Sequence, residues 1–174
     1  MYSDSYMEIE GGILIDHWGP ETEITVPNEV TAIGDKAFMY HKKLERIKIP
    51  EGVLRIGERA FEQCRSLKSI VIPNGITTIS EGMFYGCINL ESVILPDTVT
   101  EIGRRAFYGC KSLRKLIIPE NVNRICYRAF YNCESLEEAV LPNSGMNIAD
   151  SGFDACYMYM GKRGWIILRE AVAG

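Results

Sequence analysis

Residues 67–89 read LKSIVIPNGITTISEGMFYGCIN, and this pattern returns every 23 residues along the chain. Three residue types each hold one register through six copies: Pro27, Pro50, Pro73, Pro96, Pro119 and Pro142; Phe38, Phe61, Phe84, Phe107, Phe130 and Phe153; Ile33, Ile56, Ile79, Ile102, Ile125 and Ile148. Leucine recurs from Leu44 to Leu136 and cysteine from Cys64 to Cys156, with His41 in the first cysteine position. A fixed period of this length is typical of a solenoid, in which each repeat forms one coil.

The quoted unit also predicts the local structure of each coil. Residues 70–72 have the composition of a short strand, which Pro73 ends because proline cannot donate to a sheet. Asn74 and Gly75 indicate a turn, and residues 76–79 a second short extended segment. Residues 80–87 are too few for a full helix, so a single helical or 3₁₀ turn is expected there. One coil cannot bury its apolar face alone, so stability must come from stacking.

The motif L-x-x-I-x-I-P followed by I-G-x-x-A-F-x-x-C-x-S-L resembles the BspA-type leucine-rich repeats over residues 24–161. Residues 56–67 (IGERAFEQCRSL) and 102–113 (IGRRAFYGCKSL) carry it most clearly. The resemblance implies an α/β repeat solenoid: a right-handed superhelix with a parallel concave sheet and short helical turns. On this basis residues 1–174 form one leucine-rich-repeat domain, with an N-terminal cap (1–23), six repeats (24–161) and a C-terminal cap (162–174). The family also implies a surface or secreted recognition protein.

The two ends depart from the pattern, as capping repeats do. Residues 12–15 are expected to form a strand that opens the sheet, with Trp18 covering the first coil. Residues 165–168 are expected to close the sheet as a strand, the alternative being a cap helix over 165–173.

Composition and charge exclude several classes of protein. Of 174 residues, 47% are apolar and 24% charged, which is ordinary for a globular chain. The net charge of −4 gives no basic footprint for nucleic acid, and no apolar run is long enough for a membrane span. Residues 1–10 are acidic and resemble no signal peptide, which favours the cytoplasm, whereas the family resemblance favours the surface; the location stays open.

Neither the cysteines nor the histidines indicate a catalytic or metal site. The cysteine column predicts buried free thiols, with disulfides between neighbouring coils as the alternative. A straight column cannot surround zinc tetrahedrally, and no C-x-x-C motif is present. His41, beside Cys64, is interpreted as structural, and His17 and Asp16 should point to opposite faces of a strand. No enzyme activity, cofactor or metal is therefore expected.

The outward positions of the predicted concave strands suggest a binding surface. Strand alternation turns one residue of each coil outward, and four consecutive coils place an aliphatic residue there, with charges beside it. The predicted partner-binding residues are Lys48, Val71, Ile94, Ile117, Val140, Lys68, Glu91, Arg114, Lys115 and Glu137. The alternative is that these β-branched residues only favour strands. A second column, Tyr85, Tyr108 and Tyr131, fits either an interface or a shield over the phenylalanines.

The sequence thus favours a non-enzymatic protein–protein recognition module whose partner is another protein. The alternatives are a structural or self-assembly protein, which would form homo-oligomers, and a fragment of a cell-surface adhesin.

Overall fold

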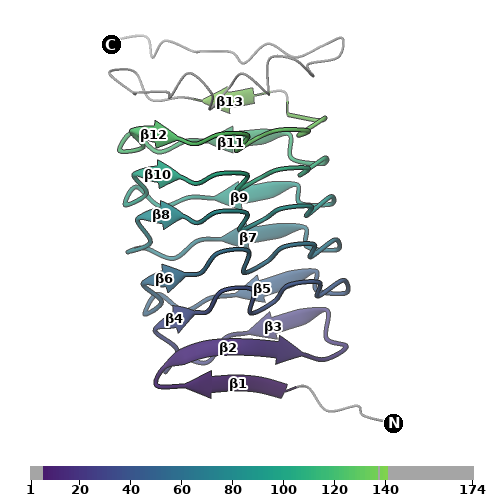
Figure 1. Cartoon of the computed structure of the whole chain (residues 1–174), viewed down its shortest axis with the longest axis vertical. Coiled ribbons are helices and arrows are strands. Elements are labelled where there is room, and N and C mark those ends of the chain that lie inside the picture. Colours follow the sequence, from purple (N-terminus) through teal and green to yellow (C-terminus); the bar gives the residue numbers. More distant parts are fainter. Residues whose placement is uncertain (1–5, 137, 141–174) are drawn as a thin grey trace.

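The computed structural model describes residues 6–136 and 138–140 and shows flat coils stacked along one axis (Figure 1). A hairpin begins the stack: β1 (Tyr6–Glu10) and β2 (Ile13–Trp18). Each coil then carries a longer and a shorter strand. The longer strands are β3 (Glu23–Thr25), β5 (Arg46–Lys48), β7 (Ser69–Val71), β9 (Ser92–Ile94), β11 (Lys115–Ile117) and β13 (Glu138–Val140). The shorter strands are β4 (Ala32–Ile33), β6 (Arg55–Ile56), β8 (Thr78–Ile79), β10 (Glu101–Ile102) and β12 (Arg124–Ile125).

Equivalent strands of successive coils pair in parallel, so the predicted parallel-strand solenoid is confirmed. The longer strands pair in the order β3-β5-β7-β9 and again as β11-β13, while the shorter strands pair as β4-β6 and β8-β10-β12. The register is one repeat throughout: Glu23 lies opposite Arg46, and Ile102 opposite Ile125. We call the side formed by the longer strands the long-strand face.

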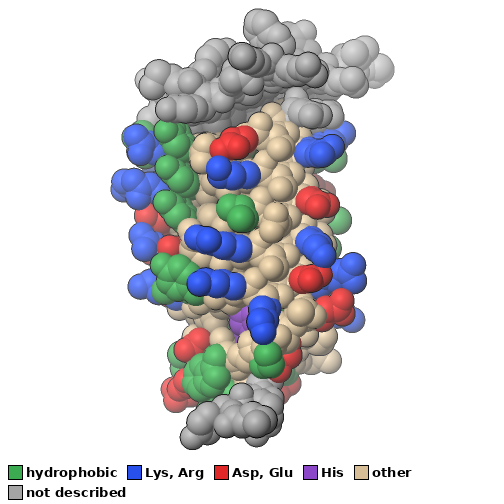
Figure 2. Space-filling view, turned by 90° about the vertical axis from the view of Figure 1, so that its right-hand side faces the viewer, with side chains coloured by type: hydrophobic (Ala, Val, Ile, Leu, Met, Phe, Trp, Pro, Cys, Tyr) green, Lys and Arg blue, Asp and Glu red, His purple; other side chains and the backbone are tan. Residues whose placement is uncertain are grey.

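The predicted short helical turns are wrong, because the described residues contain no helix. In this segment alternate backbone N–H groups donate to the next coil: Phe38 to the carbonyl of Ala60 (2.8 Å), and Phe61 to that of Met83 (3.0 Å). The N–H groups between them, such as that of Met39, donate three residues back within single turns. Tight turns with positive φ separate these bonds and prevent a helix. The positive φ values recur in two columns: Lys36, Arg59, Gly82, Arg105 and Arg128; and Tyr40, Gln63, Gly86, Gly109 and Asn132. These turns form the side of the molecule shown in Figure 2.

The core is a set of ladders, one residue per coil. The rings of Phe38, Phe61, Phe84, Phe107 and Phe130 stack with centroids 5.2–5.7 Å apart, and all are buried. The repeated isoleucines and leucines line the rest of the interior. Each coil therefore buries its apolar face against two neighbours, as a solenoid requires.

The N-terminal cap differs in part from its prediction. The expected strand is present as β2, which pairs in parallel with β4, but β1 was not expected and pairs antiparallel with β2. Trp18 does not cover the first coil: it is 50% exposed and stacks on Tyr6. His17 lies there instead, buried and 5.5 Å from the Phe38 ring, because alternation along β2 sends neighbouring side chains to opposite faces. The predicted C-terminal strand or helix lies outside the described residues.

The described residues also contain no helical segment with the length and apolar character that crossing a bilayer requires.

Candidate functional site

The long-strand face presents a row of exposed aliphatic side chains. Val71, Ile94 and Ile117 are 54%, 61% and 61% exposed, and they occupy the same position in three successive coils. Ile70, Val93 and Leu116, which precede them on the strands, are buried. The predicted alternation is therefore confirmed for these strands. We call Val71, Ile94 and Ile117 the apolar stripe.

Val71 and Ile94 of the apolar stripe lie on paired strands, whereas β11, which carries Ile117, pairs with β13. Val71 lies opposite Ile94 in the pairing of β7 with β9. Val140 continues the same register from Ile117 on β13, but its side chain lies outside the described residues, as does Glu137. Towards the N-terminus the same position is polar, with Thr25 and Lys48 both exposed. The stripe thus has a defined polar end.

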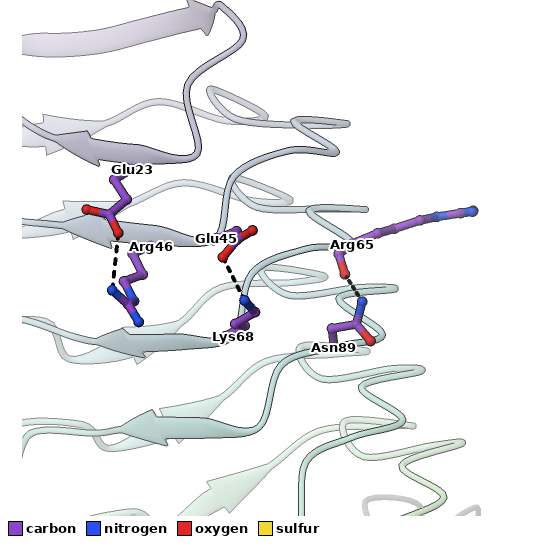
Figure 3. A network of polar contacts seen from close by, with 6 residues as sticks. All are labelled: Glu23, Glu45, Arg46, Arg65, Lys68 and Asn89. Carbon is purple, nitrogen blue, oxygen red and sulfur yellow. Dashed lines mark hydrogen bonds and ion pairs between the residues drawn. The ribbon is translucent and has the colours of Figure 1, made fainter.

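Charged residues border the N-terminal half of the face and are paired between coils. Arg46 reaches Glu23 at 3.1 Å, and Lys68 reaches Glu45 at 2.6 Å (Figure 3). The hydrogen bond from Lys68 lowers the pKa of the Glu45 carboxyl. Lys68, predicted as a binding residue, therefore already forms an ion pair with Glu45 of the preceding coil. Asn89 adds a further link between coils by donating to the backbone carbonyl of Arg65 (Figure 3).

The other predicted charges are exposed beside the apolar stripe. Lys48, Glu91, Arg114 and Lys115 all lie at the surface. Among the residues that the structure describes, the side chains of Lys48, Glu91 and Arg114 form no ion pair or hydrogen bond. The face therefore combines an apolar row with charges of both signs that are available to a partner.

The tyrosine column lies on the turns, away from this face. Tyr85, Tyr108 and Tyr131 are half-buried, and their rings stack at 4.7 and 4.9 Å. Arg128 lies over the Tyr131 ring at 5.1 Å. Because the rings face one another, they offer little ring face to a ligand, which favours a packing role.

Within the described coils the cysteine column consists of free thiols, as predicted. Cys64, Cys87 and Cys110 are buried, and Cys133 is half-buried. Each thiol donates to the carbonyl of a phenylalanine in the preceding coil: Cys64 to Phe38 (3.0 Å), Cys87 to Phe61 (3.1 Å), Cys110 to Phe84 (3.2 Å) and Cys133 to Phe107 (3.0 Å). Burial raises the pKa of Cys64 to about 12, and the pKa values of Cys87 and Cys110 also rise. Such thiols are poor nucleophiles, since the thiolate is the reactive form.

One cluster near the N-terminal end was missed by the sequence analysis. Ligand atoms of His17, Glu21 and His41 lie within 4.8 Å of one another. They adjoin a hollow of about 590 Å³, which is also lined by Lys42 and Lys43. No repeat marked the cluster in the sequence, because the cap does not follow the 23-residue period: Ile13 of β2 lies opposite Ala32 of β4, 19 residues later.

Comparison with known proteins agrees with the architecture. Residues 31–159 match the model of the BspA type leucine rich repeat region in six copies. A leucine-rich repeat protein of Bacteroides ovatus is 36% identical over 80% of this chain and 40% of its own, with a TM-score of 0.69. The leucine-rich repeat protein of T. pallidum is 27% identical over 81% of this chain and 69% of its own, with a TM-score of 0.73.

A further relative is described as a leucine-rich cell surface protein of Faecalibacterium prausnitzii. It is 25% identical over 83% of this chain and 56% of its own, with a TM-score of 0.56. This chain therefore spans less than two thirds of the B. ovatus and F. prausnitzii proteins. No curated protein matches the sequence.

Proposed function

The chain belongs to the BspA-type leucine-rich repeat family, and we propose that it is a non-enzymatic recognition module that binds a protein partner through its long-strand face. The observation that carries the proposal is the exposed apolar stripe, Val71, Ile94 and Ile117, which recurs at one position of three successive coils of the long-strand face. Exposed apolar rows bordered by polar residues are typical of protein interaction surfaces.

A rigid, preformed surface makes binding efficient. Each of these coils is hydrogen-bonded to both of its neighbours, so little ordering entropy is lost when a partner binds. Full burial of one valine or isoleucine side chain contributes about 1.5–3 kcal/mol. Lys48, Glu91 and Arg114 then select partners whose charges are complementary, since a mismatched charge at an interface is strongly unfavourable.

The cell-surface description of the F. prausnitzii protein supports a surface location for this chain too. Protease treatment of intact cells that produce the protein tests this location: a surface protein is cleaved while a cytoplasmic marker remains whole.

The proposed face is tested by Ile94→Glu with Leu54→Glu as its matched control. Leu54 is 64% exposed, slightly more than Ile94, and precedes β6 in the other row of strands. Both variants place the same carboxylate at an exposed aliphatic position, so both are expected to fold with unfolding free energies within about 0.5 kcal/mol of the unchanged protein. At an interface, however, the carboxylate at position 94 would be stripped of water without a partner.

The measurement is quantitative crosslinking and recovery of bound proteins from cells that produce the chain. A partner that the unchanged protein and Leu54→Glu recover equally, and that Ile94→Glu loses, supports the proposal. Equal recovery by all three proteins contradicts it. Sedimentation of the purified chain tests the self-assembly alternative: an oligomer that only Ile94→Glu dissociates would assign the same face to a second copy.

A further inference from the structure

The cluster of His17, Glu21 and His41 joins the N-terminal cap to the first full coil. His17 is the fifth residue of β2, Glu21 lies in the connection to β3, and His41 occupies the first position of the cysteine column. Figure 2 shows histidine surface (purple) near the N-terminal end, next to a Lys or Arg side chain. The hollow beside it makes the cluster accessible from solvent.

Both imidazoles are buried and lie side by side. His17 and His41 are 4% and 8% exposed, and their ring centroids lie 5.0 Å apart. Burial is the main cause that lowers the pKa of each, and His41 lowers the pKa of His17 further. An imidazole nitrogen is a common metal ligand.

Packing alone explains only part of this arrangement. The His17 ring continues the phenylalanine stack, which accounts for its burial beside Phe38. The Nε2 atom of His41, however, is buried without a hydrogen-bond partner among the described residues. A buried polar atom of this kind is costly unless something binds it. The Glu21 carboxylate lies on the same side, with 4.0 Å between its Oε2 and the Nε2 of His17.

We propose that His17, Glu21 and His41 form a zinc site, with two imidazole nitrogens and one carboxylate oxygen as ligands and a fourth position open to the hollow. Two histidines and a glutamate with one open position are a donor set that suits Zn²⁺. The ion would tie the cap to the first coil.

The three side chains must move slightly closer together to bind one ion. Ligands at Zn–N distances of about 2.0–2.1 Å lie roughly 3.4 Å apart in a tetrahedron. The three ligand atoms here are within 4.8 Å of one another, so each must move by about 1 Å or less. Glu21 supplies most of this movement, because its side chain is 30% exposed and has rotatable bonds. Lys42 and Lys43 oppose a cation in the hollow, but both are exposed and therefore screened.

The site is tested by titrating the metal-free protein with ZnCl₂ in a calorimeter, and with CoCl₂ by visible absorption. One ion is expected per chain, with a cobalt spectrum that lacks the thiolate charge-transfer band. Glu21→Gln and His41→Gln should each weaken zinc binding by about tenfold or more. Cys126→Ser is the control, because Cys126 is a half-buried free thiol that follows β12, far along the chain from the cluster. This variant should bind zinc with an affinity within about twofold of that of the unchanged protein.

Thermal unfolding provides the second readout. A ligand that binds only the folded state raises the melting temperature. Zinc should therefore raise the melting temperature of the unchanged protein and of Cys126→Ser, and EDTA should reverse the rise. Circular dichroism in EDTA shows whether each variant is folded. If His41→Gln is unfolded, zinc binding is compared between the unchanged protein and Glu21→Gln, whose substituted side chain is partly exposed.

The proposal is overturned if the unchanged protein binds no zinc, if Glu21→Gln binds it as tightly as the unchanged protein, or if a thiolate band appears in the cobalt spectrum. In each of these cases the two histidines serve only to pack the cap. The outcome is independent of the partner-binding face, which none of these substitutions touches.

Discussion

At the scale of single residues, the phenylalanine column carries much of the packing between coils. Phe107 is fully buried, and its ring lies 5.3 Å from Phe84 and 5.2 Å from Phe130. Phe107→Ala should lower the free energy of unfolding by about 3–5 kcal/mol, because stacked coils cannot collapse into the cavity. Urea unfolding measures the loss, with the exposed Ile117→Ala as a control. A loss below about 1 kcal/mol would show that the column is not the core.

The buried thiols predict that stability falls at alkaline pH. The folded-state pKa of Cys64 is about 12, and those of Cys87 and Cys110 are also raised, whereas an unfolded thiol titrates near about 8.5. The folded state therefore retains protons that the unfolded state loses, so the stabilisation is complete below about pH 8.5 and declines as the pH rises towards the folded values.

A single substitution isolates this effect. At pH 10 each buried thiol is expected to lower the free energy of unfolding by about 1–2 kcal/mol relative to its value at pH 7.5. Cys87→Ala should therefore lose less stability than the unchanged protein over this pH interval, as measured by urea unfolding at the two pH values. All other groups are the same in the two proteins, so the difference reports the thiol. Identical pH slopes would contradict the burial of Cys87.

At the scale of the element, the turns between the strands depend on positive φ. Gly109 has a φ of +72°, and a Cβ there would meet only Gly86 backbone atoms at 3.8 Å or more. Gly109→Ala should thus destabilise the protein by about 1–2 kcal/mol through backbone strain alone. Gly52→Ala is the control, since Gly52 has no positive φ and a Cβ there has space. It should be neutral or slightly stabilising in the same thermal melts, and equal losses in both variants would argue against the strained turn.

The strands were predictable from the sequence, whereas the turns were not. The longer strands were predictable because alternation is a local property: Val93 points in and Ile94 points out on any strand that has one buried face. The turns were not predictable in the same way, because the N–H of Phe38 finds its acceptor on Ala60, one coil later in the chain. A local propensity for a helical turn loses to that longer-range hydrogen bond.

At the scale of the whole molecule, the solenoid should tolerate the loss of one complete coil. Deletion of residues 70–92 removes 23 residues and joins Ser69 to Val93, which then takes the place of Ile70 in the ladder. The shortened chain is expected to keep its strand content and unfold at a lower temperature, because solenoid stability sums over neighbouring interfaces. Deletion of residues 70–81 breaks the register and should abolish cooperative unfolding. Circular dichroism during heating compares the two; loss of structure in both would contradict a modular stack.

The sequence by itself determined the period, the parallel stacking and the inward and outward faces of the strands. These properties follow from a pattern that repeats at one fixed interval, so that any coil predicts its neighbour. It predicted free thiols in the cysteine column but left disulfides between neighbouring coils open, and the structure shows free thiols in the described coils.

Only the tertiary structure decided the conformation of the turns. It also decided the packing of the N-terminal cap, where the repeat is broken. Trp18 and His17 are adjacent, and which of them covers the core depends on how β2 docks against β4. The approach of His17 to His41 follows from the same docking, because it sets which residues of the cap lie above the first coil. No repeat specifies that contact, since the cap has only one neighbour in the stack.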